Sequence, residues 1–79
     1  MNDIIVYTQN DCPSCKIIKM FLTEFNFSFT EKNISEDDSS RQELTHTYNS
    51  YSTPTIVVGE EVITGFDLER LKQVLDIKE

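Results

Sequence analysis

The stretch that decides the fold is YTQNDCPSCKIIKMFL, residues 7–22, which contains the only two cysteines of the chain. It continues an apolar, β-favouring run over residues 4–7, which predicts a strand covered on both faces. Pro13 suits the first position of a helix, because its missing N–H and fixed φ match that position. The residues behind it place their apolar side chains on one arc of a helical wheel. That arc is formed by Ile17, Ile18, Phe21, Leu22 and Phe25.

The middle of the chain predicts a second strand and a second helix. Phe27 and Phe29 alternate with polar residues, which is typical of a strand with one buried face. Ser35 is followed by three acidic residues, a pattern that favours the capped start of a helix. Only Leu44 and Tyr48 are clear apolar anchors of this helix, and we expect its single histidine, His46, on the exposed side.

The last third of the chain predicts a hairpin and a final helix. Thr55–Val58 and residues 62–64 are β-favouring, and Gly59 stands at the first turn position, where a type II′ hairpin prefers glycine. Asp67 can cap a helix that follows. The apolar face of that helix is formed by Leu68, Leu71, Val74 and Leu75.

The predicted order of elements is βαβαββα, within a single domain over residues 1–79. A strand, a helix and a second strand imply a right-handed parallel crossover, whereas the last two strands form an antiparallel hairpin. The fold class is therefore α/β, with a four-stranded mixed sheet flanked by three helices.

Composition excludes several functions. A net charge of −7 argues against nucleic-acid binding, which needs a basic patch. No apolar run approaches the length of a membrane span, and the first residues lack the features of a signal peptide. We therefore expect a cytoplasmic monomer with no membrane partner. In that reducing compartment a cycling disulfide is more reasonable than a static one.

The position of the Cys-x-x-Cys pair predicts two unequal sulfurs. Cys12 falls near the N-cap of the first helix, where free backbone N–H groups and the helix dipole favour thiolate over thiol. On the helical wheel it shares the polar side with Lys16 and Lys19, which we expect to tune its ionisation. Cys15 falls beside the apolar arc. The pattern indicates an exposed nucleophile, Cys12, and a partly buried resolving thiol, Cys15.

Other functions of the two cysteines fit the sequence less well than a redox reaction. Zinc needs four ligands, and the chain offers two cysteines and the distant His46. A static structural disulfide does not fit the expected compartment. An iron–sulfur cluster shared by two chains and a non-catalytic module that binds partners along a strand edge remain as alternatives. Dithiol–disulfide exchange is the favoured interpretation, with no metal.

Three segments, "YTQNDCPSC", "YSTPTIVV" and "ITGF", resemble the glutaredoxins and the closely similar NrdH-like redoxins of the thioredoxin superfamily. The resemblance covers essentially the whole chain, in the same order of elements. It implies the thioredoxin-like (glutaredoxin) fold and a thiol–disulfide oxidoreductase. It also implies that Cys12 is the nucleophile, that Cys15 resolves the mixed disulfide, and that Pro54 is the family's cis-proline. Thr53 would then offer its backbone to a substrate as one more strand does.

The same resemblance implies the remaining site and the partners. Its substrate-binding residues are Pro13, Ser14, Thr53, Pro54, Gly65, Phe66 and Asp67. No cofactor is bound tightly, and either glutathione or thioredoxin reductase supplies electrons. The substrates are proteins that contain disulfides, with ribonucleotide reductase as a candidate.

The two groups of relatives differ in the electron donor that they use. Glutathione-using members resemble one another in a lysine near the active site, where Gln9 stands here, and in an aromatic residue between the cysteines, where Ser14 stands. They also share Gly-Gly followed by two polar residues, of which only Asp67 is retained. "NDC" and "TGF" instead resemble the NrdH-like redoxins, although Asp67-Leu68 departs from the Arg-Pro that often follows Gly-Phe in that group. We expect thioredoxin reductase to reduce the pair more efficiently than glutathione does.

Overall fold

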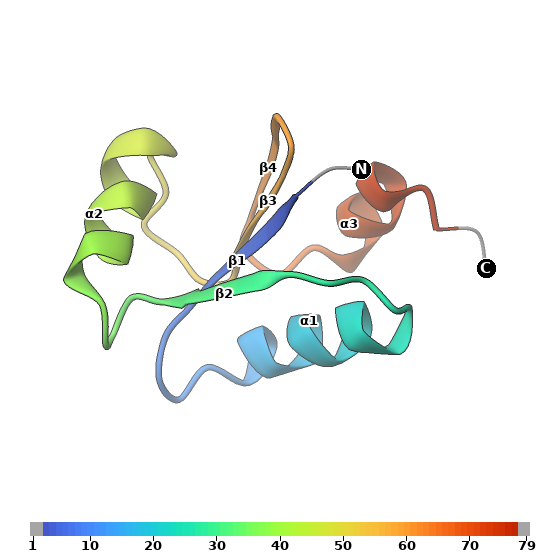
Figure 1. Cartoon of the computed structure of the whole chain (residues 1–79), viewed down its shortest axis with the longest axis horizontal. Coiled ribbons are helices and arrows are strands. Elements are labelled where there is room, and N and C mark those ends of the chain that lie inside the picture. Colours follow the sequence, from blue (N-terminus) through green and yellow to red (C-terminus); the bar gives the residue numbers. More distant parts are fainter. Residues whose placement is uncertain (1–2, 78–79) are drawn as a thin grey trace.

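A computed structural model of the protein describes residues 3–77 and shows four strands in one mixed sheet, in the order β2-β1-β3-β4 (Figure 1). The strands are β1 (Ile4–Thr8), β2 (Thr30–Asn33), β3 (Thr55–Val58) and β4 (Glu61–Thr64). The helices are α1 (Pro13–Glu24), α2 (Asp38–Thr47) and α3 (Leu68–Leu75). β1 pairs parallel with β2 and antiparallel with β3, and β3 forms a hairpin with β4. The predicted element order and mixed sheet are confirmed. None of the helices in the described range has the length and apolar character needed to cross a membrane.

One face of the sheet is covered by α1 and α3. Ile18 and Leu22 of α1 and Leu71 of α3 are completely buried against it. The strands contribute Ile4, Val6, Ile56, Val58 and Ile63 to the same cluster. Alternate residues of neighbouring strands share a face, and the pairing of Val6 with Ile56 and of Ile56 with Ile63 builds this layer. We call it the α1/α3 face.

The opposite face, which we call the α2 face, packs on α2. Its buried cluster is smaller and consists of Tyr7, Leu44 and Val57. The Tyr7 and Tyr48 rings lie 5.8 Å apart, so both predicted anchors of α2 contact the sheet. The Tyr7 hydroxyl donates a hydrogen bond to Glu43, which also accepts one from Lys32 at 2.7 Å. Burial first, and then the Glu43 carboxylate, raise the pKa of Tyr7.

The second strand lies later in the chain than the sequence pattern predicts. β2 begins only at Thr30, and Phe27 and Phe29 precede it in a segment without regular structure. Both rings are partly buried against the apolar cluster of the α1/α3 face. Their alternation with polar residues therefore reflects packing on this cluster and not the pairing of a strand in the sheet. The strand predicted over residues 27–30 is therefore placed three residues too early and shares only Thr30 with β2.

The apolar arc of α1 is narrower than predicted. Ile18 and Leu22 are buried, but Ile17 is 47% exposed and Phe25 is 38% exposed. Phe25 lies after the last helical residue, as the C-cap, and its ring packs on Phe21 at 4.8 Å between centroids. Only a narrow stripe of the helix thus faces the sheet.

The helix starts agree with the sequence in two cases out of three. Pro13 opens α1, and Asp67 caps α3 by accepting a hydrogen bond from the Arg70 N–H at 3.0 Å. The predicted cap of α2, Ser35, is wrong: the N-cap is Asp37, whose carboxylate accepts from the Ser40 hydroxyl at 2.7 Å. The hydroxyl of Ser35 is used elsewhere, on the loop before the cysteines.

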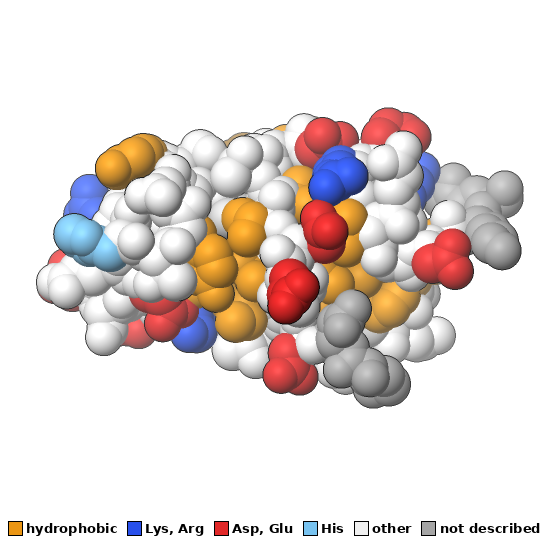
Figure 2. Space-filling model, turned by 90° about the horizontal axis from the view of Figure 1, so that it is seen from above, with side chains coloured by type: hydrophobic (Ala, Val, Ile, Leu, Met, Phe, Trp, Pro, Cys, Tyr) orange, Lys and Arg blue, Asp and Glu red, His pale blue; other side chains and the backbone are white. Residues whose placement is uncertain are grey.

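The surface carries the acidic excess that the composition predicts. On the face seen in Figure 2, Asp and Glu side chains lie around a central group of apolar side chains. His46 lies exposed on α2, as expected. Gly59 opens the β3–β4 turn with a φ of 58°, a left-handed conformation that suits glycine.

Candidate active site

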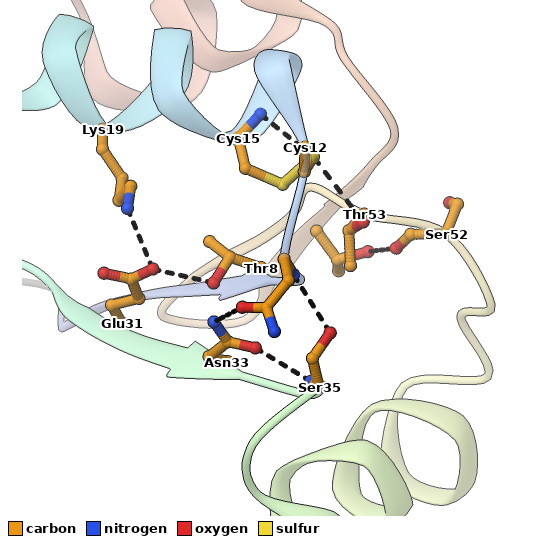
Figure 3. The surroundings of a disulfide bond; sticks show 11 residues. Thr8, Cys12, Cys15, Lys19, Glu31, Asn33, Ser35, Ser52 and Thr53 are labelled. Carbon is orange, nitrogen blue, oxygen red and sulfur yellow. Dashed lines mark hydrogen bonds and ion pairs between the residues drawn. A yellow bond between two sulfur atoms is a disulfide. The ribbon is translucent and has the colours of Figure 1, made fainter.

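The two cysteines lie between the end of β1 and the first turn of α1, where they form a disulfide bond (Figure 3). Cys12 is the N-cap of α1, with φ −115° and ψ 95°, and Pro13 is the first helical residue. The Cys15 backbone N–H donates a hydrogen bond to the Cys12 sulfur at 3.2 Å. The sulfur of Cys12 thus occupies the place that a serine or aspartate oxygen takes at an ordinary helix start.

The two sulfurs differ less in exposure than the helical wheel predicts. Cys12 is only 8% exposed and Cys15 is 2% exposed. The expectation that Cys12 is open to solvent is therefore wrong for this disulfide-bonded form. The Cys15 sulfur covers one side of Cys12, and the Thr53 hydroxyl lies 3.8 Å from the Cys12 sulfur on another.

Thr53 and Pro54 approach the cysteines from the start of β3. The peptide bond between them is cis, and Pro54 is buried. Two hydroxyls beneath this loop hold it: Thr55 donates to the Ser52 carbonyl at 2.7 Å, and the Ser50 hydroxyl lies 2.8 Å from that of Thr55. Ser50 and Thr55 are 3% and 0% exposed, and sequence reasoning missed both. The only signal for them is the concentration of Ser and Thr over residues 50–55.

The two lysines of the pattern lie in different surroundings. Lys16 is exposed on the first turn of α1. The Lys19 ammonium points to Glu31 on β2, at 3.0 Å, rather than to the sulfurs (Figure 3). The same carboxylate accepts a hydrogen bond from Thr8 at 2.8 Å. The hydrogen bond from Lys19, and next that from Thr8, hold the pKa of Glu31 below its usual value.

Among the described residues, the other predicted site residues make no hydrogen bond to the cysteine sulfurs. Ser14 is half-buried, and Pro13 is exposed. Gly65 has a φ of 77°, and Phe66, which follows it, is 48% exposed. The Asp67 carboxylate is directed to its own helix, where it caps α3.

The loop between β1 and the cysteines is held by residues that the sequence did not indicate. Asn10 contacts both Asn33 and Ser35, which lie at the end of β2 and just after it. These residues are more than 20 positions apart in the chain, and no local pattern connects them.

Comparison with known proteins agrees with this geometry. The family model described as Glutaredoxin matches residues 4–63. The Glutaredoxin-like protein NrdH of Lactococcus lactis subsp. cremoris is 29% identical over 63 residues, which cover 80% of this chain and 86% of that protein.

Two solved structures have the same fold. The thioredoxin-like protein BC3987 is 46% identical, with a TM-score of 0.89 over 91% of this chain and 99% of the other. The NrdH-redoxin of Escherichia coli has a TM-score of 0.79 at 21% identity, over 98% and 96% of the two chains. The fold of this chain is thus thioredoxin-like.

Proposed function

The chain belongs to the glutaredoxin family, whose members are thiol–disulfide oxidoreductases, and from this premise we propose that Cys12 and Cys15 carry electrons from a reductase to disulfide-bonded proteins. The observation that carries the proposal is the place of Cys12 at the N-cap of α1. There the Cys15 N–H points at its sulfur from 3.2 Å. A hydrogen-bond donor and the positive end of a helix both favour a thiolate, which is the attacking form of cysteine.

The exchange runs in two steps, with Cys12 as nucleophile and Cys15 as resolving thiol. The Cys12 thiolate attacks one sulfur of a substrate disulfide, and the other substrate sulfur leaves as a thiolate that takes a proton from water. Cys15 then loses its proton to solvent and attacks the Cys12 sulfur, which releases the second substrate thiolate. The product is the Cys12–Cys15 disulfide seen here. Two electrons and two protons delivered through the reductase restore both thiols.

Thr53 is the proposed guide for the substrate. It precedes a cis-proline, and its hydroxyl lies 3.8 Å from the Cys12 sulfur. An extended substrate segment that pairs with the Thr53 backbone would therefore bring its own sulfur beside Cys12. Pro13, Ser14, Gly65 and Phe66 would line the path of that segment.

The proposed electron donor is thioredoxin reductase rather than glutathione. Glutathione carries carboxylates, so its recognition needs cations or free N–H groups near Cys12. Here the Asp67 carboxylate already uses the first turn of α3, and the Lys19 ammonium is paired with Glu31 at 3.0 Å. The net charge of −7 also repels the peptide. The half-exposed Phe66 ring offers a protein partner an apolar contact instead.

The physiological partners proposed are cytoplasmic proteins with disulfides. Ribonucleotide reductase is included because the "NDC" and "TGF" segments resemble the NrdH-like redoxins. A relative that is itself named NrdH supports the choice.

The test measures NADPH consumption with insulin as the disulfide substrate, using either thioredoxin reductase or glutathione with glutathione reductase. We expect faster turnover with thioredoxin reductase, loss of all turnover in Cys12→Ser, and accumulation of a mixed disulfide in Cys15→Ser. Faster turnover with the glutathione system would overturn the choice of donor. Full activity of Cys12→Ser would overturn the function itself.

A matched pair of variants tests the physical reason for the choice of donor. Gln9→Lys places a cation beside the cysteine loop and should raise glutathione-dependent turnover. Gln73→Lys makes the same change of charge on the exposed side of α3 and should leave that turnover unchanged. Equal effects of the two variants would show that net charge, rather than a local cation, decides the donor.

A further inference from the structure

Asn33, the last residue of β2, joins two loops through its backbone and its side chain. Its carbonyl accepts hydrogen bonds from the N–H groups of Glu36 at 3.2 Å and Asp37 at 3.0 Å. Its side-chain oxygen accepts from the Ser35 N–H at 2.8 Å. These three bonds close the turn that leads into α2. The side-chain amide nitrogen then donates to the side-chain oxygen of Asn10 at 3.1 Å.

A second bond holds the backbone of the same residue. The Asn10 N–H donates to the Ser35 hydroxyl at 3.0 Å. Asn10 is therefore fixed on its side chain by Asn33 and on its main chain by Ser35. We call these three residues the Asn10 clamp. The clamp stands beside the end of β1, where the Ile34 N–H also bonds to the Thr8 carbonyl at 2.8 Å.

The residue after Asn10 explains why the loop needs support. Asp11 has a φ of 57°, in the left-handed region that aspartate adopts more readily than most residues but less readily than glycine. Cys12 follows directly, with the extended backbone of an N-cap. The orientation of the Cys12 sulfur toward the Cys15 N–H thus depends on a backbone conformation that Asp11 does not prefer by itself.

We propose that the Asn10 clamp is a positioning device for the redox reaction. It holds the loop over residues 10–11 so that the Cys12 sulfur stays in front of the Cys15 N–H after the disulfide is reduced. Asn33 and Ser35 touch neither sulfur and act only through this loop. The inference rests on the proposed function, in which Cys12 is the attacking sulfur.

The experiment follows the alkylation rate of Cys12 by iodoacetamide in the fully reduced protein, as a function of pH, by peptide mass spectrometry. Ser35→Ala removes one hydrogen bond, to the Asn10 N–H, and should slow alkylation at neutral pH by a factor of about three to ten. Asn33→Ala removes the bonds to Asn10 and to the Ser35 N–H and should slow alkylation at least as much. The midpoint of the pH profile should move upward. Ser39→Ala and Gln42→Ala, which change exposed side chains on α2, should match the wild type. Equal rates in all four variants would overturn the inference.

A pair of charge variants separates the clamp from a general loss of structure. Asn10→Asp leaves the Asn33 amide as donor to a carboxylate, and Asn33→Asp leaves the Asn10 amide, once rotated, in the same role. Asn10→Asp should stay within about twofold of the wild-type rate. Asn33→Asp also removes the donor to the Glu36 carboxylate, 3.4 Å away, and should slow alkylation further. The double variant places two carboxylates against each other, and its rate should fall about fivefold or more below the product of the single effects. Multiplicative effects would contradict direct pairing.

Two further measurements distinguish a loss of folding, a failure of the clamp proposal and a failure of the proposed function. Unfolding in urea is measured for each variant, and if Asn33→Ala does not fold, Ser35→Ala and the charge pair decide the question. Cys12→Ser separates the inference from the function on which it rests. An inactive Cys12→Ser together with unchanged clamp variants rejects the clamp alone, whereas an active Cys12→Ser rejects the proposed function.

Discussion

The two faces of the sheet differ in the number and kind of side chains that they bury. The α1/α3 face buries eight apolar side chains from two helices and three strands, and all of them are aliphatic. The α2 face buries three side chains, one of which is a tyrosine whose hydroxyl bonds to a glutamate. Because burial of apolar surface is the main favourable term in folding, most of the stability comes from the α1/α3 face.

The α2 face supports two loops that lie beside the cysteines. One of these loops leads into α2, and the other follows it. The turn over residues 33–37 leads into the helix and carries Asn33 and Ser35 of the Asn10 clamp. Past the other end of the helix, the Ser50 N–H bonds to the Leu44 carbonyl at 3.1 Å, and the Ser50 hydroxyl supports the loop of Thr53. The α1/α3 face thus buries most of the apolar side chains and carries the cysteines on α1, while the α2 face supports the loops beside them.

The largest effect is expected from a cavity in the α1/α3 face. Leu22→Ala should lower the free energy of unfolding, measured by urea denaturation, by about 3–5 kcal/mol, since the side chain is completely buried. Met20→Ala on the same helix is the control, and it should stay within about 0.5 kcal/mol because Met20 is 69% exposed. A loss of the same size in both variants would contradict the division between the faces.

A cavity in the α2 face should lower stability less, and activity more, than a cavity in the α1/α3 face. Leu44→Ala should lower the free energy of unfolding by about 2–3 kcal/mol, because its cluster is small and has partly exposed neighbours that can move inward. At a temperature where both variants are folded, its insulin reduction should fall further than that of Leu22→Ala. The reverse order of activities would show that α2 does not support the loops of the site.

The smallest effect concerns acid pH. The hydrogen bond from Lys32, and next that from Tyr7, hold the pKa of Glu43 below its usual value of 4.5. The stabilisation is therefore complete above that value and is lost as the pH falls through the lower pKa of the folded state. Glu43→Gln should weaken the dependence of unfolding on pH in this window, by less than about 1 kcal/mol because the side chain is partly exposed.

Glu24→Gln, an exposed change at the end of α1, is the control for that measurement. It should leave the acid dependence as it is in the wild type. If Glu43→Gln and Glu24→Gln behave alike, the contacts of Glu43 on the α2 face contribute nothing measurable.

The sequence predicts best what depends on local pattern. The apolar run of β1, Pro13 at the start of α1 and Asp67 at the start of α3 are all where the pattern indicates. The place of Cys12 at a helix N-cap follows from the same local reasoning. Its low exposure does not, because that depends on the approach of Thr53, which lies 41 residues further along the chain.

The supports of the site are the part that no local pattern predicts. Asn33 reaches Asn10 across 23 positions, and Glu31 reaches Thr8 across the same separation. These polar residues would read as ordinary surface or strand residues in any window of the sequence. Only the parallel pairing of β1 with β2, which sets Thr8 beside Asn33, brings them together.

The polar composition of β2 has a consequence for how the sheet ends. β2 is an edge strand with the sequence TEKN, and its two central side chains form ion pairs with Lys19 and Glu43. An edge strand exposes unpaired backbone groups, and apolar residues there invite a neighbouring chain to continue the sheet. A strand of one threonine, two charged residues and one amide residue offers such a neighbour little apolar surface to bury. β2 lacks the apolar pattern that would have placed it correctly from the sequence, and the same lack protects this edge from aggregation.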